Sequence, residues 1–303
     1  MRALQNLSNA HQGYLYTFIT MLIWGSFSLF ARINAYWQIQ VWDTLFLRFL
    51  VAGLIILPII IIKKQWRFLL DYRMVLIAIT GSVGYCAFVY SGFFYAPVAH
   101  GAVLLNGTFP LFTALIASLM LGQKIDRSTQ LSLAIIIVTL MFLAMMMNND
   151  PVGFGFGDVM FLCSGALYGL FSTLLRRWQF TAWQVVCGIA IWSMVLYLPI
   201  YFAFFTPDLA HIQPYQLAMQ AFFHGVLVVI VATLTYAKAV EKIGLFQASS
   251  IATLAPFLSA VVAVPLLNEP LSPLMLYGLI GMGIGALQPW RWWDMLKNRQ
   301  SAK

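Results

Sequence analysis

Residues 131–147 read LSLAIIIVTLMFLAMMM, a stretch with no charged residue, no proline and no glycine. Residues 49–62, FLVAGLIILPIIII, also carry no charge and are as strongly apolar. Neither stretch alternates polar and apolar residues, which is the pattern of a strand in a membrane β-barrel. Because a helix needs about 20 apolar residues to cross the hydrocarbon core of a bilayer, both stretches predict membrane-spanning helices.

The composition extends this prediction to the whole chain. Of its 303 residues, 62% are hydrophobic and only 9% are charged, and the mean hydropathy is +0.86. A soluble domain carries about 25% charged residues, so a water-soluble globule is excluded. The cysteines form no CxxC pair and lie in apolar segments, which indicates packing roles for Cys86, Cys163 and Cys187.

Apolar runs bounded by charges, proline and glycine predict ten membrane helices. The first run exceeds the apolar region of a signal peptide, so we expect it to remain as a crossing. The predicted helices cover residues 14–33, 43–62, 73–92, 97–121, 130–147, 156–175, 182–205, 216–237, 244–267 and 274–290.

The charges predict the orientation of these helices. With the N-terminus inside, all but Arg32 and Arg48 of the 17 basic residues lie in or beside cytoplasmic loops, and the opposite loops carry Asp43, Asp150, Asp158, Asp208 and Glu269. This split follows the positive-inside rule and predicts that both termini are cytoplasmic. The net charge of +8 is spread over short loops beside the membrane, which indicates contact with anionic lipid and not with nucleic acid.

Two segments reveal an internal repeat. Residues 24–32, WGSFSLFAR, and 168–176, YGLFSTLLR, share Gly, Phe, Ser and Arg at an offset of 144 residues. At an offset of 146 residues, identical pairs run from Tyr90 and Tyr236 to Leu121 and Leu267. Each half has five predicted spans, an odd number, so the halves cross the membrane in opposite directions. We therefore expect an all-α membrane protein built from two inverted five-helix repeats, residues 1–150 and 151–303. Inverted repeats are typical of secondary transporters; the alternative is a duplication that only doubled a helix bundle.

The ordered motifs resemble the EamA-like part of the drug/metabolite transporter superfamily over essentially the whole chain. The resemblance rests on Trp24-Gly25, Arg48-Phe49, Gly157-Asp158, and the Pro110 and Pro256 helices followed by Gly122-Gln123-Lys124 and Asn268-Glu269-Pro270. It implies ten helices around a central cavity and transport of small metabolites, often amino acids or related compounds and commonly outward. The first loop has Gly122-Gln123 where the family usually has Gly-Glu.

Ionisable side chains inside a bilayer are costly and point to function. Arg48 could hold a substrate carboxylate through its fork of donors, or could turn outward and pair with Asp43. His100 and His224 suit proton coupling or substrate binding, although either could simply bond a neighbouring helix. No Asp or Glu is predicted at mid-membrane, which disfavours a relay of buried carboxylates.

Other candidates line the predicted cavity. Asn106 lies near mid-membrane, one turn before Pro110, which frees the backbone carbonyl of Asn106. The equivalent helix carries Gln247; helix-to-helix hydrogen bonding is the alternative role for both amides. Aromatic side chains could contact an amphipathic solute or could only pack: Trp24, Tyr85, Tyr90 and Tyr236.

The sequence thus predicts a bacterial inner-membrane secondary transporter, an exporter of small organic metabolites that works by alternating access. No phosphate loop, metal cluster or nucleophile triad is present in the sequence, so we do not expect ATP-driven pumping within this chain. The predicted transporter is not an enzyme and has no cofactor or metal. The predicted partners are a small-molecule substrate and membrane lipids, and a homodimer is allowed. The rival predictions are an intramembrane enzyme acting on a lipid or isoprenoid, and a membrane scaffold or sensor.

Overall fold

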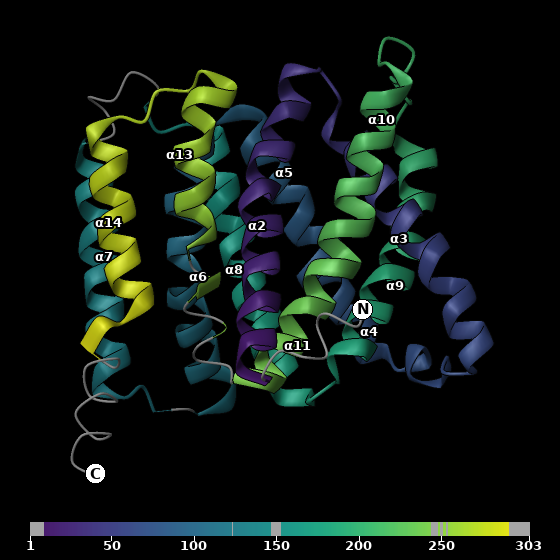
Figure 1. The fold of residues 1–303 in the computed structure, drawn as a ribbon, viewed down its shortest axis with the longest axis horizontal. Coiled ribbons are helices and arrows are strands. Elements are labelled where there is room, and N and C mark those ends of the chain that lie inside the picture. Colours follow the sequence, from purple (N-terminus) through teal and green to yellow (C-terminus); the bar gives the residue numbers. More distant parts are fainter. Residues whose placement is uncertain are drawn as a thin grey trace.

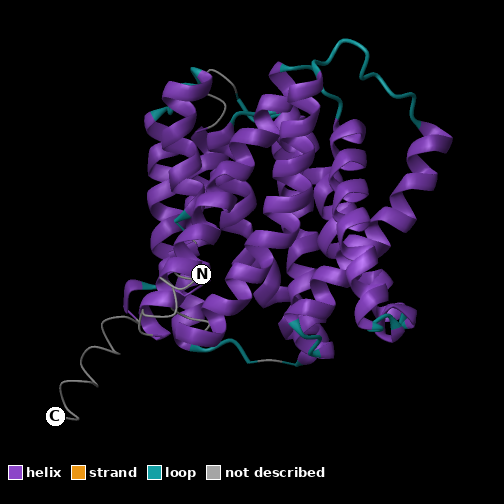
Figure 2. Cartoon of the chain, turned by 45° about the vertical axis from the view of Figure 1, so that its right-hand side comes forward, coloured by secondary structure: helices purple, strands orange, loops and turns teal. Residues whose placement is uncertain are grey.

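The computed structural model describes residues 9–122, 124–146, 153–243, 248, 251–252 and 254–290. In this part of the chain all regular structure is helical (Figure 2). The first half contains α2 (Asn9–Tyr36), α3 (Val41–Lys63), the 3-10 turn η1 (Arg67–Leu70), α4 (Tyr72–Ala78), η2 (Ile79–Val83), α5 (Gly84–Tyr95), α6 (Val98–Leu121) and α7 (Arg127–Met146). The second half contains α8 (Phe156–Trp178), α9 (Ala182–Phe204), α10 (Pro214–Ala221), η4 (Phe222–Ala232), α11 (Thr233–Ile243), α13 (Ala255–Leu267) and α14 (Pro273–Leu287).

Seven continuous helical segments are long and apolar enough to cross a membrane. They are α2, α3, the segment Tyr72–Tyr95, α6, α8, α9 and the segment Pro214–Ile243. Three shorter apolar helices, Arg127–Leu143, Ala255–Leu267 and Pro273–Gly285, lie where the other predicted spans fall. The prediction of a multi-pass helical membrane protein is therefore confirmed, while the exact number of ten crossings stays a prediction.

Local signals set the helix ends within a few residues of the predicted ones. Proline follows α5 and starts α10 and α14, where its missing N–H costs nothing. Thr181 caps α9 by accepting a hydrogen bond from the Gln184 N–H, and Asp71 caps α4 through the N–H of Arg73. For the predicted span 244–267, α13 covers residues from Ala255 to Leu267, and most of residues 244–254 lie outside the described part.

The helices connect alternately at two faces of the bundle (Figure 1). The basic face is where α2 begins and α14 ends (Figure 1). It receives the end of α3 with Lys63 and Lys64, the turn η1 with Arg67, and the end of α8 with Arg176 and Arg177. The acidic face receives the first turns of α3 and α8 with Asp43 and Asp158, the loop before α10 with Asp208, and Glu269 after α13. Since α2 runs toward the acidic face and its repeat partner α8 runs away from it, corresponding helices of the two halves point in opposite directions.

The packing follows the repeat. Helix α6 packs on α8, and its counterpart α13 packs on α2; likewise α5 packs on α8 and α11 on α2. The pairs α3 with α9 and α7 with α14 each join a helix to its own counterpart. The two halves therefore use the same contacts on each other. The predicted boundary between them, at residues 150 and 151, lies outside the described residues.

Equivalent glycines make two of these contacts possible. A Cβ added to Gly169 of α8 would lie 2.8 Å from the Cβ of Phe112 on α6. A Cβ added to Gly25 of α2 would lie 2.9 Å from Leu258 on α13. Gly25 and Gly169 are repeat partners at an offset of 144 residues, and Phe112 and Leu258 are partners at 146. The close helix approach is thus a property of the repeated unit.

Both halves also contain a π-helical segment at corresponding places. Segment η2 lies in the third predicted span, and its repeat equivalent, residues 225–229, lies within η4 in the eighth. Such segments add a residue to a helical turn and occur often at functional sites. Here they belong to the two spans that carry Tyr90 and His224.

Candidate functional site

Three of the predicted site residues meet inside the bundle. The Arg48 Nη1 of α3 donates a hydrogen bond to the Tyr90 hydroxyl of α5 at 3.2 Å. The same hydroxyl lies 2.6 Å from Nδ1 of His224 in η4. Their exposed fractions are only 7%, 2% and 0%, respectively. We call these three residues the Arg48 group; they bring together a cation, a phenol and an imidazole from both halves.

Aromatic rings enclose the Arg48 group. The Phe27 ring of α2 lies 5.4 Å from the Tyr90 ring and 5.6 Å from the His224 ring. Phe223 stacks on Phe30 at 3.7 Å and meets the His224 ring edge-on at 5.2 Å. These rings exclude water from the polar group, which strengthens its electrostatic interactions.

Arg48 is not paired with Asp43. The Tyr201 hydroxyl donates a hydrogen bond to Oδ1 of the buried Asp43. Among the described residues, Nε of Arg48 has no hydrogen-bond partner. The alternative in which Arg48 turns outward toward Asp43 is therefore wrong, and the guanidinium stays among the helices.

Two aromatic groups contain the other aromatic candidates. Tyr85 of α5 lies 5.4 Å from Tyr168 of α8, which stacks on Phe109 of α6 at 4.4 Å. In the other half, Trp24 of α2 lies 5.1 Å from Tyr236 of α11. Tyr85, Tyr168, Trp24 and Tyr236 are all partly exposed in their helices. Tyr85 and Phe109 also pack against the apolar cluster that contains Tyr90, so the first aromatic group adjoins the Arg48 group.

His100 lies elsewhere. Its Nδ1 is 2.8 Å from Oδ1 of Asp158, and both side chains are 2% exposed. Asp158 Oδ2 also accepts a hydrogen bond from the Gly155 N–H at the start of α8. His100 thus joins the beginning of α6 to the beginning of α8 near the acidic face, and its bond to Asp158 is separate from the hydrogen bonds of the Arg48 group.

The two predicted amides cannot be placed. Asn106 belongs to α6, but its side chain is outside what the structure describes. Gln247 lies outside the described residues altogether. Their roles in a cavity wall stay predictions.

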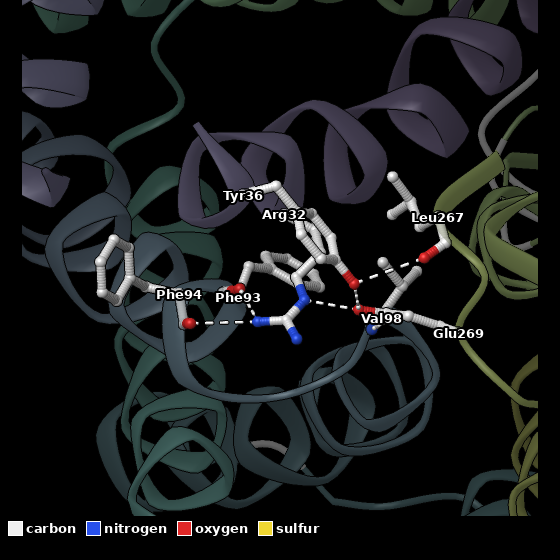
Figure 3. A network of polar contacts seen from close by, with 7 residues as sticks. All are labelled: Arg32, Tyr36, Phe93, Phe94, Val98, Leu267 and Glu269. Atoms are coloured by element: carbon white, nitrogen blue, oxygen red, sulfur yellow. Dashed lines mark hydrogen bonds and ion pairs between the residues drawn. The ribbon is translucent and has the colours of Figure 1, made fainter. Parts of the chain in front are cut away.

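An ion pair at the acidic face was not predicted as a site (Figure 3). Arg32 Nε of α2 lies 2.5 Å from Glu269 Oε1, and Arg32 Nη1 donates to the carbonyls of Phe93 and Phe94 at the end of α5 at 3.1 and 3.0 Å. Glu269 also accepts from the Tyr36 hydroxyl at 3.1 Å and, through Oε2, from the Val98 N–H of α6 at 2.8 Å. We call Arg32, Tyr36, Val98 and Glu269 the acidic-face clamp.

The clamp joins the ends of four helices from both halves. A carboxylate at the N-terminus of α6 is favoured by the helix dipole, and its bond to Arg32 is charge-assisted. The signal for it in the sequence was Arg32 itself, the one basic residue that the predicted topology places in an otherwise acidic set of loops. Nothing in the sequence links Arg32 with Glu269, which lies 237 residues away.

The fold and the buried polar group define a class, the polytopic helical membrane proteins built from two repeats. The family model of the EamA-like transporters matches residues 11–145 and 155–288. The chain belongs to the EamA-like transporter family, as its sequence motifs predicted, and is a membrane transporter of small molecules.

One solved crystal structure, described only as that of a protein, has a similar fold. The similarity covers 93% of this chain and 96% of the other, with a TM-score of 0.64 and 18% sequence identity. At this identity the likeness supports the fold alone. A comparison with curated proteins gave no match.

Proposed function

We propose that the protein is a secondary transporter of a bacterial inner membrane that exports small organic metabolites, amino acids and related compounds among them, by alternating access. The observation that carries this proposal is the Arg48 group, buried between helices of both halves. Ionisable groups inside a membrane are costly and typically mark a solute or ion path. In transporters with inverted repeats, the substrate binds where the repeats meet.

The basic face is proposed to be cytoplasmic, and the acidic face to be outside. Support comes from the positive-inside rule, since cytoplasmic loops carry the excess of Lys and Arg. Exported solute then enters from the basic face, binds at the Arg48 group and leaves through the acidic face.

The acidic-face clamp is proposed to be the outer gate. It joins α2 and α5 to α6 and α13 through the ion pair between Arg32 and Glu269, whose side chains are 17% and 9% exposed. Water can therefore reach the pair and replace its hydrogen bonds when the acidic face opens. For alternating access, this clamp must break while the basic face closes.

The repeat makes the two gates unequal. Arg176, the partner of Arg32 at an offset of 144 residues, is exposed at the basic face. The position that corresponds to Glu269 at an offset of 146 is Gln123, and a neutral amide cannot form an ion pair with Arg176. We infer that the solute-free protein favours the state with a closed acidic face. That state suits an exporter, because its basic face is open to cytoplasmic solute.

In this proposal Arg48, Tyr90 and His224 contact the polar part of the solute. The neighbouring aromatic side chains of Trp24, Tyr85 and Tyr236 contact its apolar part. Asn106 and Gln247 complete the wall, and His100 positions the start of α6.

Reconstitution into liposomes tests the proposal. Purified protein is assayed with a panel of radiolabelled amino acids, organic acids and aromatic metabolites, with and without a pH gradient. We expect flux of at least one compound that is lost in Arg48→Gln and kept in Arg67→Gln, a matched change at an exposed arginine on the basic face. Solute flux that is independent of the pH gradient excludes a mechanism in which a histidine couples solute transport to proton transport. A folded protein that moves none of these compounds contradicts the proposal.

A further inference from the structure

The Arg48 group contains a positive charge with no counter-ion in the described part of the chain. Among the described residues, no carboxylate forms an ion pair with Arg48, and its side chain donates its hydrogen bond to the uncharged Tyr90 hydroxyl. Asp43, the nearest acid along α3, is bonded to Tyr201. A buried charge without a partner is strongly destabilising, so this guanidinium calls for an anion from outside the chain.

Two hydrogen-bonding nitrogens of the group also lack partners in the described part of the chain. They are Nε of Arg48 and Nε2 of His224, on side chains that are 7% and 0% exposed. Because the Tyr90 hydroxyl accepts a hydrogen bond from Arg48, its own proton is free to go to Nδ1 of His224. The neutral imidazole then carries its hydrogen on Nε2, so both unpartnered nitrogens are donors.

Two buried donors, one of them charged, are groups of the kind that bind a carboxylate. The surroundings of the group are aromatic. The Phe27 ring lies against Tyr90 and His224. The Tyr85 ring contacts the rings of Phe109 and Tyr168. Ring faces of this kind suit an apolar or aromatic body attached to the carboxylate.

We propose that the Arg48 group is the binding site for an organic monocarboxylate with net charge −1 and an apolar body, in preference to a zwitterionic amino acid. A zwitterion has no net charge and leaves the charge of Arg48 uncompensated, whereas a monoanion neutralises it. This inference rests on the proposed transport function and narrows the substrate to one charge class.

Three probes that share one skeleton test the charge preference: 3-phenylpropionate, phenylalanine and 3-phenylpropanamide. They present an anion, a zwitterion and a neutral amide. Binding is measured from the rise in melting temperature of the protein in lipid nanodiscs over a concentration series. We expect 3-phenylpropionate to bind at least tenfold more tightly than the other two. Equal binding of the three probes, or tighter binding of phenylalanine, overturns the inference.

Variants locate the effect. Arg48→Gln is expected to weaken 3-phenylpropionate binding by about 10- to 100-fold, the usual range for a lost hydrogen bond to a charged group. Binding of the amide changes little, and Arg67→Gln keeps the wild-type preference. If Arg48→Gln does not fold, Arg48→Lys keeps the charge but loses the fork, and the preference for the anion over the amide is expected to persist with weaker affinity. An unchanged affinity in the folded Gln variant contradicts the assignment.

Two further measurements separate the inference from its alternatives. Chloride is added alone to a sulfate buffer; stabilisation that chloride reproduces in full, and that 3-phenylpropionate does not increase, assigns the site to a simple anion and overturns the inference. Liposome flux of phenylalanine or the amide without preference for the acid also overturns it, but leaves the proposed transport function intact. Binding of 3-phenylpropionate without flux of any compound supports the site and contradicts the transport function.

Discussion

Replacing one carboxylate oxygen of Glu269 by an amide nitrogen is enough to weaken the acidic-face clamp. Glu269→Gln keeps the shape of the side chain and one acceptor oxygen, but it removes the charge that holds Arg32. If the clamp is the outer gate, this change should favour the state in which the acidic face is open. Helix packing around the clamp should otherwise be preserved.

The structure sets the size of the effect. The bond between Arg32 and Glu269 is 2.5 Å long, and both side chains are mostly buried. Hydrogen bonds to charged groups contribute about 1.5–3 kcal/mol. Because Arg32 is partly solvated and the amide can still accept from Val98, we expect a loss of about 1–2 kcal/mol. That corresponds to a shift of about 5- to 30-fold toward the open state.

Cysteine labelling measures this shift. Ser28 lies one turn below Arg32 on α2 and is buried, so Ser28→Cys should react only when the acidic face opens. The native Cys86, Cys163 and Cys187 are replaced by alanine, and a membrane-impermeant maleimide is applied to intact cells. The labelling rate should rise about 5- to 30-fold in the Glu269→Gln background, in line with the population shift.

Two controls separate gating from damage. Glu241→Gln makes the same chemical change at an exposed position of α11 and should leave the rate unchanged. Arg32→Gln should raise the rate by a smaller factor in the Glu269→Gln background than in the wild-type background, since both changes remove the same ion pair. The gate is refuted if Glu269→Gln has the same labelling rate as the Glu241→Gln control. It is also refuted if the labelling rate rises only because the melting temperature has fallen so far that the protein unfolds.

The remaining predictions concern the repeat and the topology. Gln123→Glu places an acid at the position that corresponds to Glu269, so it should increase labelling of Ser28→Cys from the acidic side and slow labelling from the basic side. Gly169→Leu should lower the free energy of unfolding by about 1–3 kcal/mol, because α6 leaves no room for the side chain; the measurement is a fall in melting temperature. The control is Gly155→Ala, where an added Cβ meets nothing within 4 Å. An equal effect of the two changes contradicts the packing argument. A cysteine at Asp208 should react with an impermeant reagent in intact cells and one at Lys124 should not; the reverse result would invert the proposed orientation.

Much of the fold could be predicted because membrane helices are determined locally. Inside lipid, each backbone N–H and C=O must find its partner within the same helix. An apolar run such as residues 131–147 therefore predicts a helix without reference to the rest of the chain. The described boundaries of α6 and α8 therefore lie close to the predicted ones. The repeat could be read as well, since Gly25 and Gly169 kept their identity for the same packing reason.

The site was predicted only in part. Arg48 and His224 stood out because ionisable groups are rare in apolar spans, but their common partner Tyr90 was one of many aromatic residues, and nothing in its spacing indicated a bond to both. His100 carried the same signal as His224, yet the structure gives it a buried partner, Asp158, at the start of a neighbouring helix.

By itself, the sequence determined that this chain lies in a membrane, that its regular structure is helical, and that it is built from two related halves. These properties depend on hydropathy and on contacts within one helix, and both are encoded in consecutive residues. The tertiary structure decided which polar side chains meet: Arg48 with Tyr90 and His224 rather than with Asp43, and Arg32 with Glu269. Such pairings join residues far apart in the chain, and they depend on how each helix is rotated and shifted against its neighbours, which no local pattern specifies.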